Sequence, residues 1–374
     1  MNFDLTDEQT LLQDMVARLV ADRYAFDARG KILKSPEGWS RALWKEMAGL
    51  GLLGVNVPED DGGLGGGAVE TKVVMEALGK GLVVEPYLAS AVVATVLLRH
   101  CPAGAARSRL LGALAAGEDI LAPALYERRG RFDLDHVGTS AVRRGADHVL
   151  NGEKSAVIGG GIASGFIVSA RVGAGSDAAG IGLFHVPRDA KGVTVVAARA
   201  IDNSSIATLL LDDVALSPEH ALAPAHALPI IERGVDAGIA ALAAEAVGVI
   251  RASIDLTADY LRTRQQFGRP IGQFQVLSHA CVDMFVQGEE VSSASILAAG
   301  RCDSSDARTR RRAISAAKVT ANKACRFVGQ TAIQLHGGIG MTEEYAIGHY
   351  FKRLTTIEQT FGDTDHHVGL FAAA

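Results

Sequence analysis

Cysteine is scarce in this chain of 374 residues, and the four that it has are far apart. Cys101, Cys281, Cys302 and Cys325 form no CxxC pair and no spacing with histidine that would give a zinc ion four ligands. The sequence therefore predicts no metal site. This usage favours the reducing cytosol, and we expect a cytoplasmic protein.

An excess of positive charge is also missing. The formal net charge is -5 and the isoelectric point is near 6.1, so the chain lacks the basic surface that nucleic acid attracts. Its one basic run, "RTRRR" at Arg308 to Arg312, precedes an alanine-rich amphipathic segment. We interpret this run as the solvated start of a helix.

No apolar run reaches the length of about 20 residues that spans a bilayer. The first residues, "MNFDLTDEQTLLQDM", are acidic and amphipathic, and they lack the basic and apolar regions of a signal peptide. We therefore expect no membrane span.

What the chain does have is apolar content for a large core: 48% of its residues are hydrophobic and only 21% are charged. Apolar residues recur at helical spacing from Thr6 to about Gly117, with a break at Pro102. Short β-type runs follow from Ile120 to about Leu222, and long helices return near Pro229. The pattern predicts an α+β protein with a helical domain (1–119), an antiparallel β domain (120–224) and a helical bundle (225–374).

Two local signals refine this prediction. Asn151-Gly152 stands between apolar flanks and predicts a hairpin turn, because glycine accepts the positive φ of a type I′ turn. The nearly all-apolar "GIAALAAEAVGVI" predicts a helix that is buried on every side.

Two longer stretches carry a specific resemblance. "YLRTRQQFGRPIGQFQVLSHACVDM" (260–284) and "VGQTAIQLHGGIGMTEEYAIGHYFKR" (328–353) resemble the paired signature regions of the acyl-CoA dehydrogenase family. The α, β, α order, the "VPEDDGGLG" loop and the "LNGEK" segment also fall where that family has them. The resemblance implies an N-terminal helical domain, a middle β-barrel or sandwich and a C-terminal four-helix bundle.

It also implies the chemistry of a flavoprotein that desaturates an acyl-CoA thioester between its α and β carbons. In the family, FAD lies at a subunit interface, a carboxylate removes the α proton, and an electron-transfer flavoprotein accepts the electrons. Because an α C–H is a weak acid, the base must be desolvated and close to that proton.

The resemblance assigns two groups of residues to FAD. The "RxxFG" motif and the glutamine after it correspond to Arg264, Phe267 and Gln275, which reach the ADP half of the cofactor across the subunit interface. The "QLHGG" motif corresponds to Gln334, His336, Gly337 and Gly338, at the adenine end. A guanidinium can clamp a pyrophosphate, and paired glycines allow close backbone approach.

The segments that would hold the flavin ring depart from the family. A small-residue loop is replaced by "PALYERRGRFD" (123–133), whose arginines, Arg128, Arg129 and Arg131, are either solvated loop charges or ligands of a CoA phosphate or distal carboxylate. The usual tryptophan and threonine beside the ring correspond to Ala156 and Ile158. The indole and the hydroxyl are thereby lost.

The usual catalytic glutamate also has no counterpart. Its turn corresponds to "EQTFGDTDHH" (358–367), with Phe361 or Gly362 at the position of the base and Asp363 one residue beyond. Glu245 is the other candidate, since burial in "AALAAEAVG" would desolvate a base; the alternative is a glutamate paired with an arginine across a helix interface. Asp365, His366 and His367 are predicted to be surface or helix-end groups.

Two hypotheses follow. In the first, the chain is one subunit of a heterotetramer, most similar to the small subunits of pimeloyl-CoA dehydrogenase-type enzymes, and completes the FAD site of a homologous partner. In the second, it is a self-sufficient homotetramer that uses Asp363 or Glu245 as the base. A non-catalytic acyl-CoA-binding or structural subunit is a further alternative.

Overall fold

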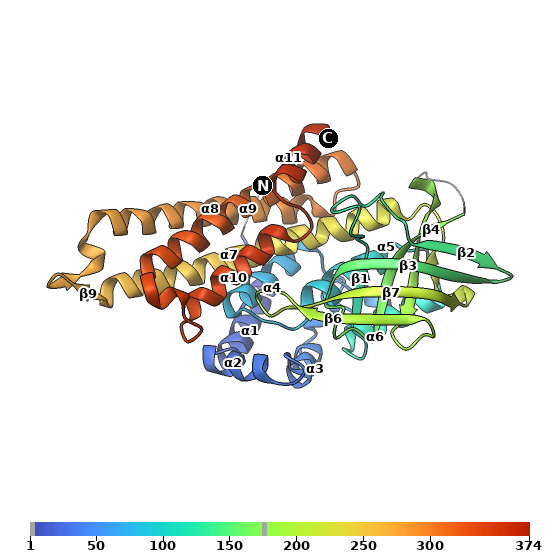
Figure 1. Cartoon of the computed structure of the whole chain (residues 1–374), viewed down its shortest axis with the longest axis horizontal. Coiled ribbons are helices and arrows are strands. Elements are labelled where there is room, and N and C mark those ends of the chain that lie inside the picture. The colour runs from blue at the N-terminus through green and yellow to red at the C-terminus, as the bar shows by residue number, and fades with distance from the viewer. Residues whose placement is uncertain (1–3, 174–177) are drawn as a thin grey trace. The chain divides into compact units, whose positions relative to one another are not determined.

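The computed structural model describes residues 4–173 and 178–374 (Figure 1). They form two compact units, of which the first combines Met1–Lys34, Ala68–Val83 and Ile239–Ala374, and the second combines Ser35–Gly67 and Val84–Gly238. The division into three domains at residues 119/120 and 224/225 stays a prediction.

The first unit is helical. Its elements are α1 (Asp7–Arg23), α2 (Phe26–Lys34), α4 (Ala68–Gly81), most of α7 (Leu228–Thr263), the hairpin of β9 (Gln265–Gln266) and β10 (Arg269–Pro270), η6 (Ile271–Gln273), α8 (Gln275–Cys302), α9 (Ala307–His336), η7 (Gly337–Met341), α10 (Ala346–Gln359) and α11 (Thr364–Ala373). α9 packs against α8, α10 and α11, and α1 packs against α4. This unit holds the predicted C-terminal helices and the hairpin between them.

α7 is the long apolar helix that the sequence predicted. It is long and apolar enough to cross a bilayer by composition, but 89% of its most apolar window is buried inside the protein, as in a core helix. Gly248 allows α4 to approach closely, because a β-carbon there would overlap the carbonyl oxygen of Glu76.

The second unit combines short helices with the β-sheet. Its helical elements are α3 (Arg41–Gly49), η1 (Leu52–Gly54), η2 (Glu59–Asp61), η3 (Leu88–Ala94), α5 (Thr95–His100), α6 (Ala105–Ala115), η4 (Ala178–Gly180) and η5 (Pro218–His220). The predicted break at Pro102 is confirmed, since α5 ends before it and α6 begins after it. α7 starts at Leu228, next to the predicted Pro229.

The sheet has the strand order β6-β7-β3-β2-β4-β5-β8, with β1 beside β4. Its strands are β1 (Leu121–Ala124), β2 (Ser140–Arg144), β3 (Asp147–Ile158), β4 (Gly165–Val172), β5 (Ile181–Pro187), β6 (Val193–Arg199), β7 (Ser205–Leu216) and β8 (Ala221–Ala223). Most pairings are antiparallel as predicted, but β4 runs parallel to both β1 and β2.

The predicted turn at Asn151-Gly152 is wrong, because both residues lie inside β3. The turn falls at Gly145, where φ is 67°. Asn151 instead bonds across to Asp213 of β7, and Gly152 lies at an irregularity in the register between these strands. A β-carbon on Gly152 would come within 2.7 Å of Thr139 Cα, so glycine is required here for close packing rather than for a turn.

The basic run before α9 is only partly solvated. Asp306 caps the helix as its carboxylate accepts from the Arg308 amide, so the prediction of a helix start is confirmed. Arg310, however, is 2% exposed, and its Nη1 donates to the Ser304 carbonyl at 2.9 Å. One charge of the run thus fixes the loop before the helix.

Candidate functional site

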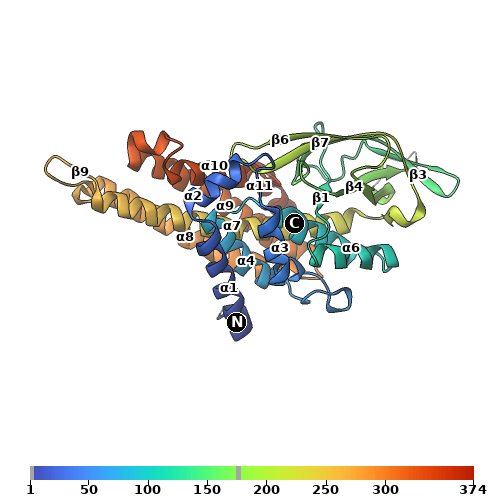
Figure 2. The same ribbon diagram turned by 90° about the horizontal axis from the view of Figure 1, so that it is seen from below.

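The "RxxFG" motif forms the hairpin that joins α7 to α8, and both views show it at one end of these helices (Figures 1 and 2). The loop residues Phe267 and Gly268 have φ of 54° and 76°, as a type I′ turn requires. Phe267 is 90% exposed. Arg264 and Gln275 are exposed as well. The three residues therefore present a cation, an aromatic ring and an amide to whatever contacts this hairpin.

The hairpin is held in shape by rings rather than by burial. Phe274 meets Phe267 edge to face at a centroid distance of 6.0 Å, and the Arg269 guanidinium lies 4.2 Å from the centre of the Phe274 ring. A loop that is fixed before it meets a ligand loses little conformational entropy on binding.

The "QLHGG" motif ends α9, where Gly337 leaves the helix with φ of 63°. Gln334 is exposed, whereas His336 is 3% exposed. Burial lowers the pKa of His336, although a hydrogen bond from Nδ1 to the Ala332 carbonyl acts in the opposite direction. A β-carbon on Gly337 or Gly338 would meet no atom within 4 Å, so the backbone there is open to approach.

A stack of aromatic rings joins the two motifs. His336 lies 4.6 Å from Tyr260, centroid to centroid and nearly parallel, and 5.2 Å from Tyr345. Tyr260 belongs to the last turn of α7, so the stack fixes the end of α9 beside the start of the hairpin. The structure thus brings the two predicted cofactor regions together within one unit, and their exposed groups fit the ADP half of FAD.

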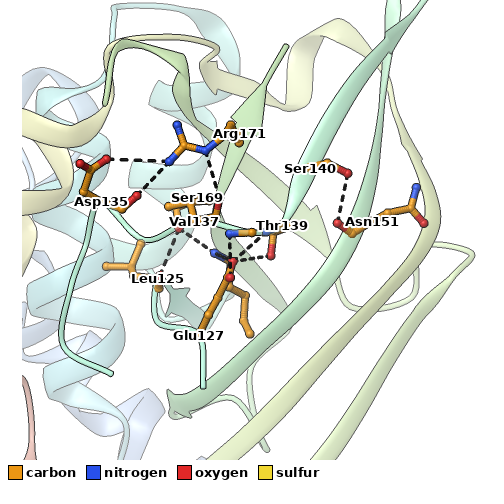
Figure 3. Close-up of polar contacts among 11 residues, drawn as sticks. Leu125, Glu127, Asp135, Val137, Thr139, Ser140, Asn151, Ser169 and Arg171 are labelled. Atoms are coloured by element: carbon orange, nitrogen blue, oxygen red, sulfur yellow. Dashed lines mark hydrogen bonds and ion pairs between the residues drawn. The ribbon is translucent and has the colours of Figure 1, made fainter. Parts of the chain in front are cut away.

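The segment in place of the small-residue loop is tied down by Glu127, which lies near the centre of Figure 3. Its carboxylate accepts hydrogen bonds from the Gly138 amide at 2.7 Å, from the Thr139 amide at 2.9 Å and hydroxyl at 2.7 Å, and from Lys154 Nζ at 2.8 Å. Lys154 is fully buried and also donates to Ser169 Oγ at 3.0 Å. This network links the segment to β3 and β4.

Electrostatics match this geometry. Burial acts to raise the pKa of Glu127, but the Lys154 charge and the hydrogen bonds outweigh it and lower that pKa. Burial lowers the pKa of Lys154 to about 8 despite the attraction of Glu127. Sequence reasoning missed this pair, although a lysine in the middle of an apolar strand pattern could have indicated a buried partner.

The three arginines of the segment point to solvent. The side chain of Arg128 is 82% exposed, with Glu153 at 3.7 Å, and Arg129 and Arg131 are exposed too. Ala156 is exposed at a register shift in β3 and has φ of 51°, and Ile158 pairs with Ile206 of β7. These residues offer neither a ring to stack nor a hydroxyl to donate, so this side fits the flavin ring poorly.

The turn after α10 is fixed through its own carbonyl groups. Lys318 Nζ donates to the Ile357 carbonyl at 2.6 Å, Asn322 Nδ2 donates to that of Gly362 at 3.4 Å, and His367 Nε2 lies 3.0 Å from that of Phe361. Burial lowers the pKa of Lys318 to about 7. His367 was predicted to be a surface or helix-end group; it lies in the first turn of α11, as a helix-end group does, and it is buried rather than at the surface.

Neither candidate base is free in this structure. Asp363 caps α11, since its carboxylate accepts from the His366 amide at 2.9 Å. Of the two residues that the resemblance aligns with the usual glutamate, Phe361 is buried with φ of 60°, and Gly362 has φ of 124°. Glu245 is 4% exposed and is held at both oxygens by Arg353, with Nε and Nη2 each at 2.6 Å. For Glu245 the structure has the helix-to-helix ion pair that the sequence offered as the alternative.

Comparison with known proteins identifies the class as flavin-dependent oxidoreductases. Family models match in three stretches: acyl-CoA dehydrogenase N-terminal domain at 6–118, middle domain at 122–214 and C-terminal domain at 228–374. The chain is 30% identical to acyl-CoA dehydrogenase FadE12 of Mycobacterium tuberculosis over 92% of its length and 90% of that protein. It therefore belongs to the acyl-CoA dehydrogenase family, whose members bind FAD.

Other relatives agree with this assignment. Probable acyl-CoA dehydrogenase YngJ of Bacillus subtilis is 29% identical, over 96% of this chain and 95% of that one. Butyryl-CoA dehydrogenase from Megasphaera elsdenii shares the fold with a TM-score of 0.91 at 23% identity, covering 100% and 99% of the two chains. A chain of a Tcur3481-Tcur3483 steroid ACAD variant gives a TM-score of 0.88 at 29% identity, covering 98% and 97%.

Proposed function

We propose that this chain is one subunit of a heteromeric acyl-CoA dehydrogenase, and that it completes an FAD site carried by a homologous partner. In this assembly Arg264, Phe267 and Gln275 of the hairpin and Gln334, Gly337 and Gly338 after α9 contact the ADP half of the cofactor. His336 keeps the second motif in place through its stack with Tyr260.

One contrast carries the proposal: the chain keeps the groups that would serve a neighbouring flavin and lacks those that would serve its own. The hairpin and the glycine pair are exposed and preorganised. The base position corresponds to Phe361 or Gly362, neither of which has a carboxylate, and the carboxylates of Asp363 and Glu245 are engaged in a helix cap and an ion pair. A base must be close to the substrate proton and free to accept it.

The similarity to a chain of the Tcur3481-Tcur3483 steroid ACAD, whose name joins two proteins, gives further support. When bound, FAD supplies the acceptor for the hydride that leaves the substrate. This chain's own residues bind and orient the ADP half, while the partner supplies the base and the ring pocket. An electron-transfer flavoprotein accepts the electrons, and the assembly works in the cytoplasm on an acyl-CoA ester.

The test is to purify the chain alone and together with a homologous chain encoded beside it, and to measure flavin per chain by visible absorbance. We expect the lone chain to hold little flavin, and the complex to hold one FAD for each pair of chains and to bleach with its acyl-CoA substrate. Full flavin occupancy and acyl-CoA-dependent bleaching of the lone chain would establish the homomeric alternative instead.

A matched pair of variants tests the hairpin. Arg264→Gln removes the proposed pyrophosphate clamp, and we expect flavin content of the complex to fall about tenfold at limiting FAD, as for one charge-assisted contact. Arg262→Gln removes an exposed arginine two residues away that pairs with Asp259, and it should leave flavin content unchanged. Equal loss in both variants would contradict the specific role of Arg264.

A further inference from the structure

A cavity lies wholly within the unit of Ser35–Gly67 and Val84–Gly238, and none of the residues assigned above to FAD or the base lines it. Its volume is about 1360 Å³. The lining comes from residues 36–45 around the start of α3, from 116–120 after α6, from the loop 161–164, and from Arg188 and residues 197–205 of the sheet. We propose that this cavity binds a small organic anion with a flat apolar body, an aromatic carboxylate being the simplest case.

Arg188 is the first ground for an anion. Its Nη1 donates to the carbonyls of Gly160 at 3.1 Å and Ala163 at 3.0 Å, which holds the guanidinium at the cavity wall. Among residues 4–173 and 178–374 it has no carboxylate partner. A fixed, half-buried guanidinium with free N–H groups is a preorganised donor for a carboxylate.

The balance of charge around the cavity is the second ground. The basic residues Arg41, Lys45, Arg188 and Arg199 line the cavity, and so do the carboxylates of Glu37 and Glu118. Arg199 is engaged in another contact of the fold and does not enter this balance. Arg41 and Glu37 neutralise each other in an ion pair at 2.9 Å. Lys45 is exposed and has no ion pair within the described ranges, so the remaining charges favour an anion.

The apolar part of the wall is the third ground, because both tryptophans of the chain, Trp39 and Trp44, contribute to it, together with Val84, Ile120 and Ile162. The two rings are 5% and 2% exposed, so each offers the cavity a small part of its surface, which an aromatic partner can contact edge to face. The volume exceeds the range of roughly 300–1,000 Å³ typical of small-molecule sites, so an aromatic acid fits with room for substituents.

The position of the tryptophans also provides the assay, since every indole of the chain borders the cavity. The probe is 4-iodobenzoate, whose iodine quenches indole fluorescence on contact, compared with uncharged 4-iodobenzamide of the same shape. Wild type and variants are titrated as purified, at equal flavin content. We expect saturable quenching by the benzoate and at least about tenfold weaker binding of the benzamide, as for the loss of one charge-assisted pair.

Variants locate the charge. Arg188→Gln should weaken the benzoate about tenfold and leave the benzamide unchanged, while Arg143→Gln, an exposed arginine outside the cavity that also bonds a carbonyl, should change neither. Lys45→Gln breaks no hydrogen bond or ion pair of the described residues and should weaken the benzoate about threefold, so it tests the charge even if Arg188→Gln unfolds the unit. Equal affinity for the two probes, equal effects of Arg188→Gln and Arg143→Gln, or no saturable quenching would each overturn the proposal.

Discussion

The pair of Glu245 and Arg353 gives the most demanding prediction, because Glu245 is a candidate for two different roles, the catalytic base and one half of a buried ion pair. Glu245→Gln leaves the Arg353 guanidinium beside a neutral amide in a site where the two side chains are 5% and 17% exposed. Two unit charges about 4 Å apart attract by about 4 kcal/mol at an effective dielectric constant of 20. Breaking a buried pair from one side costs about 3–5 kcal/mol in general.

We therefore expect Glu245→Gln and Arg353→Gln each to lower the free energy of unfolding by about 3 kcal/mol. The double replacement Glu245→Leu with Arg353→Met removes both charges and keeps the volume, so it should cost less than either single change. The assay is urea unfolding followed by far-ultraviolet circular dichroism, applied to the first cooperative transition. Substrate-dependent bleaching of the assembled enzyme is measured on the same samples below that transition.

If Glu245 is a structural ion-pair partner, Glu245→Gln lowers stability, and the molecules that remain folded keep their turnover. If Glu245 is the base, Glu245→Gln abolishes turnover and stability is kept, since exchanging a carboxylate for an amide removes the proton acceptor but preserves the shape. If the free energy of unfolding of Glu245→Gln lies within about 0.5 kcal/mol of wild type while bleaching is abolished, the structural role of the ion pair is refuted.

Three further predictions concern single positions. Burial lowers the pKa of Lys318 from 10.5, the value of a free lysine, to about 7 in the folded protein. Between these two pH values the unfolded chain binds the extra proton, so the stability due to this group rises with pH there, and Lys318→Met should remove a slope of up to about 1.4 kcal/mol per pH unit from the free energy of unfolding in urea. Asp363→Ala should lower the free energy of unfolding by about 1 kcal/mol, because it removes the cap of α11. Asp363→Asn keeps a capping oxygen and should change neither stability nor turnover, so a loss of turnover in this variant would identify Asp363 as the base. Ala156→Gly relieves a left-handed backbone and should raise the free energy of unfolding in urea by about 0.5 kcal/mol, while the control Ala198→Gly, on the exposed strand β6, should lower it. A lower free energy of unfolding in Ala156→Gly would show that the backbone at Ala156 is not strained.

The sequence predicted those features that depend on local periodicity. The apolar run of α7, the break at Pro102 and the capped start of α9 follow from side chains within one or two turns of each other. These are short-range properties, and the structure has them where the sequence places them. The hairpin at Phe267-Gly268 was not predicted, although it too is a local feature, since its two strands lie within a few residues of the turn.

The errors arise where a distant segment decides the local conformation. Asn151-Gly152 has the composition of a turn, but β7 provides Asp213 as a partner for the asparagine, and the closeness of Thr139 requires the glycine. His367 was expected to be a surface or helix-end group, and it does lie in the first turn of α11, but it is buried. The Phe361 carbonyl and the Ser315 hydroxyl, one of them 52 positions away, bury it instead. A single sequence contains no record of which segment will lie opposite.

Left-handed backbone occurs both in the hairpin that we propose to bind FAD and in the segments that lack the family's usual groups. Within the described part of the chain, the non-glycine residues with positive φ include Ala156, Phe267 and Phe361, which lie in three of the segments that the resemblance links to the flavin or the base. Each such residue costs of order 1–2 kcal/mol and persists only where the surrounding structure dictates it. At Phe267 this backbone presents an exposed ring, whereas Phe361 is buried and Ala156 carries only a methyl group. The hairpin is held by its own ring contacts, those of Phe274 with Phe267 and with Arg269, so its shape does not depend on the segments of Ala156 and Phe361. On the proposed function, the hairpin can therefore serve the FAD site of a partner while its own chain supplies no base.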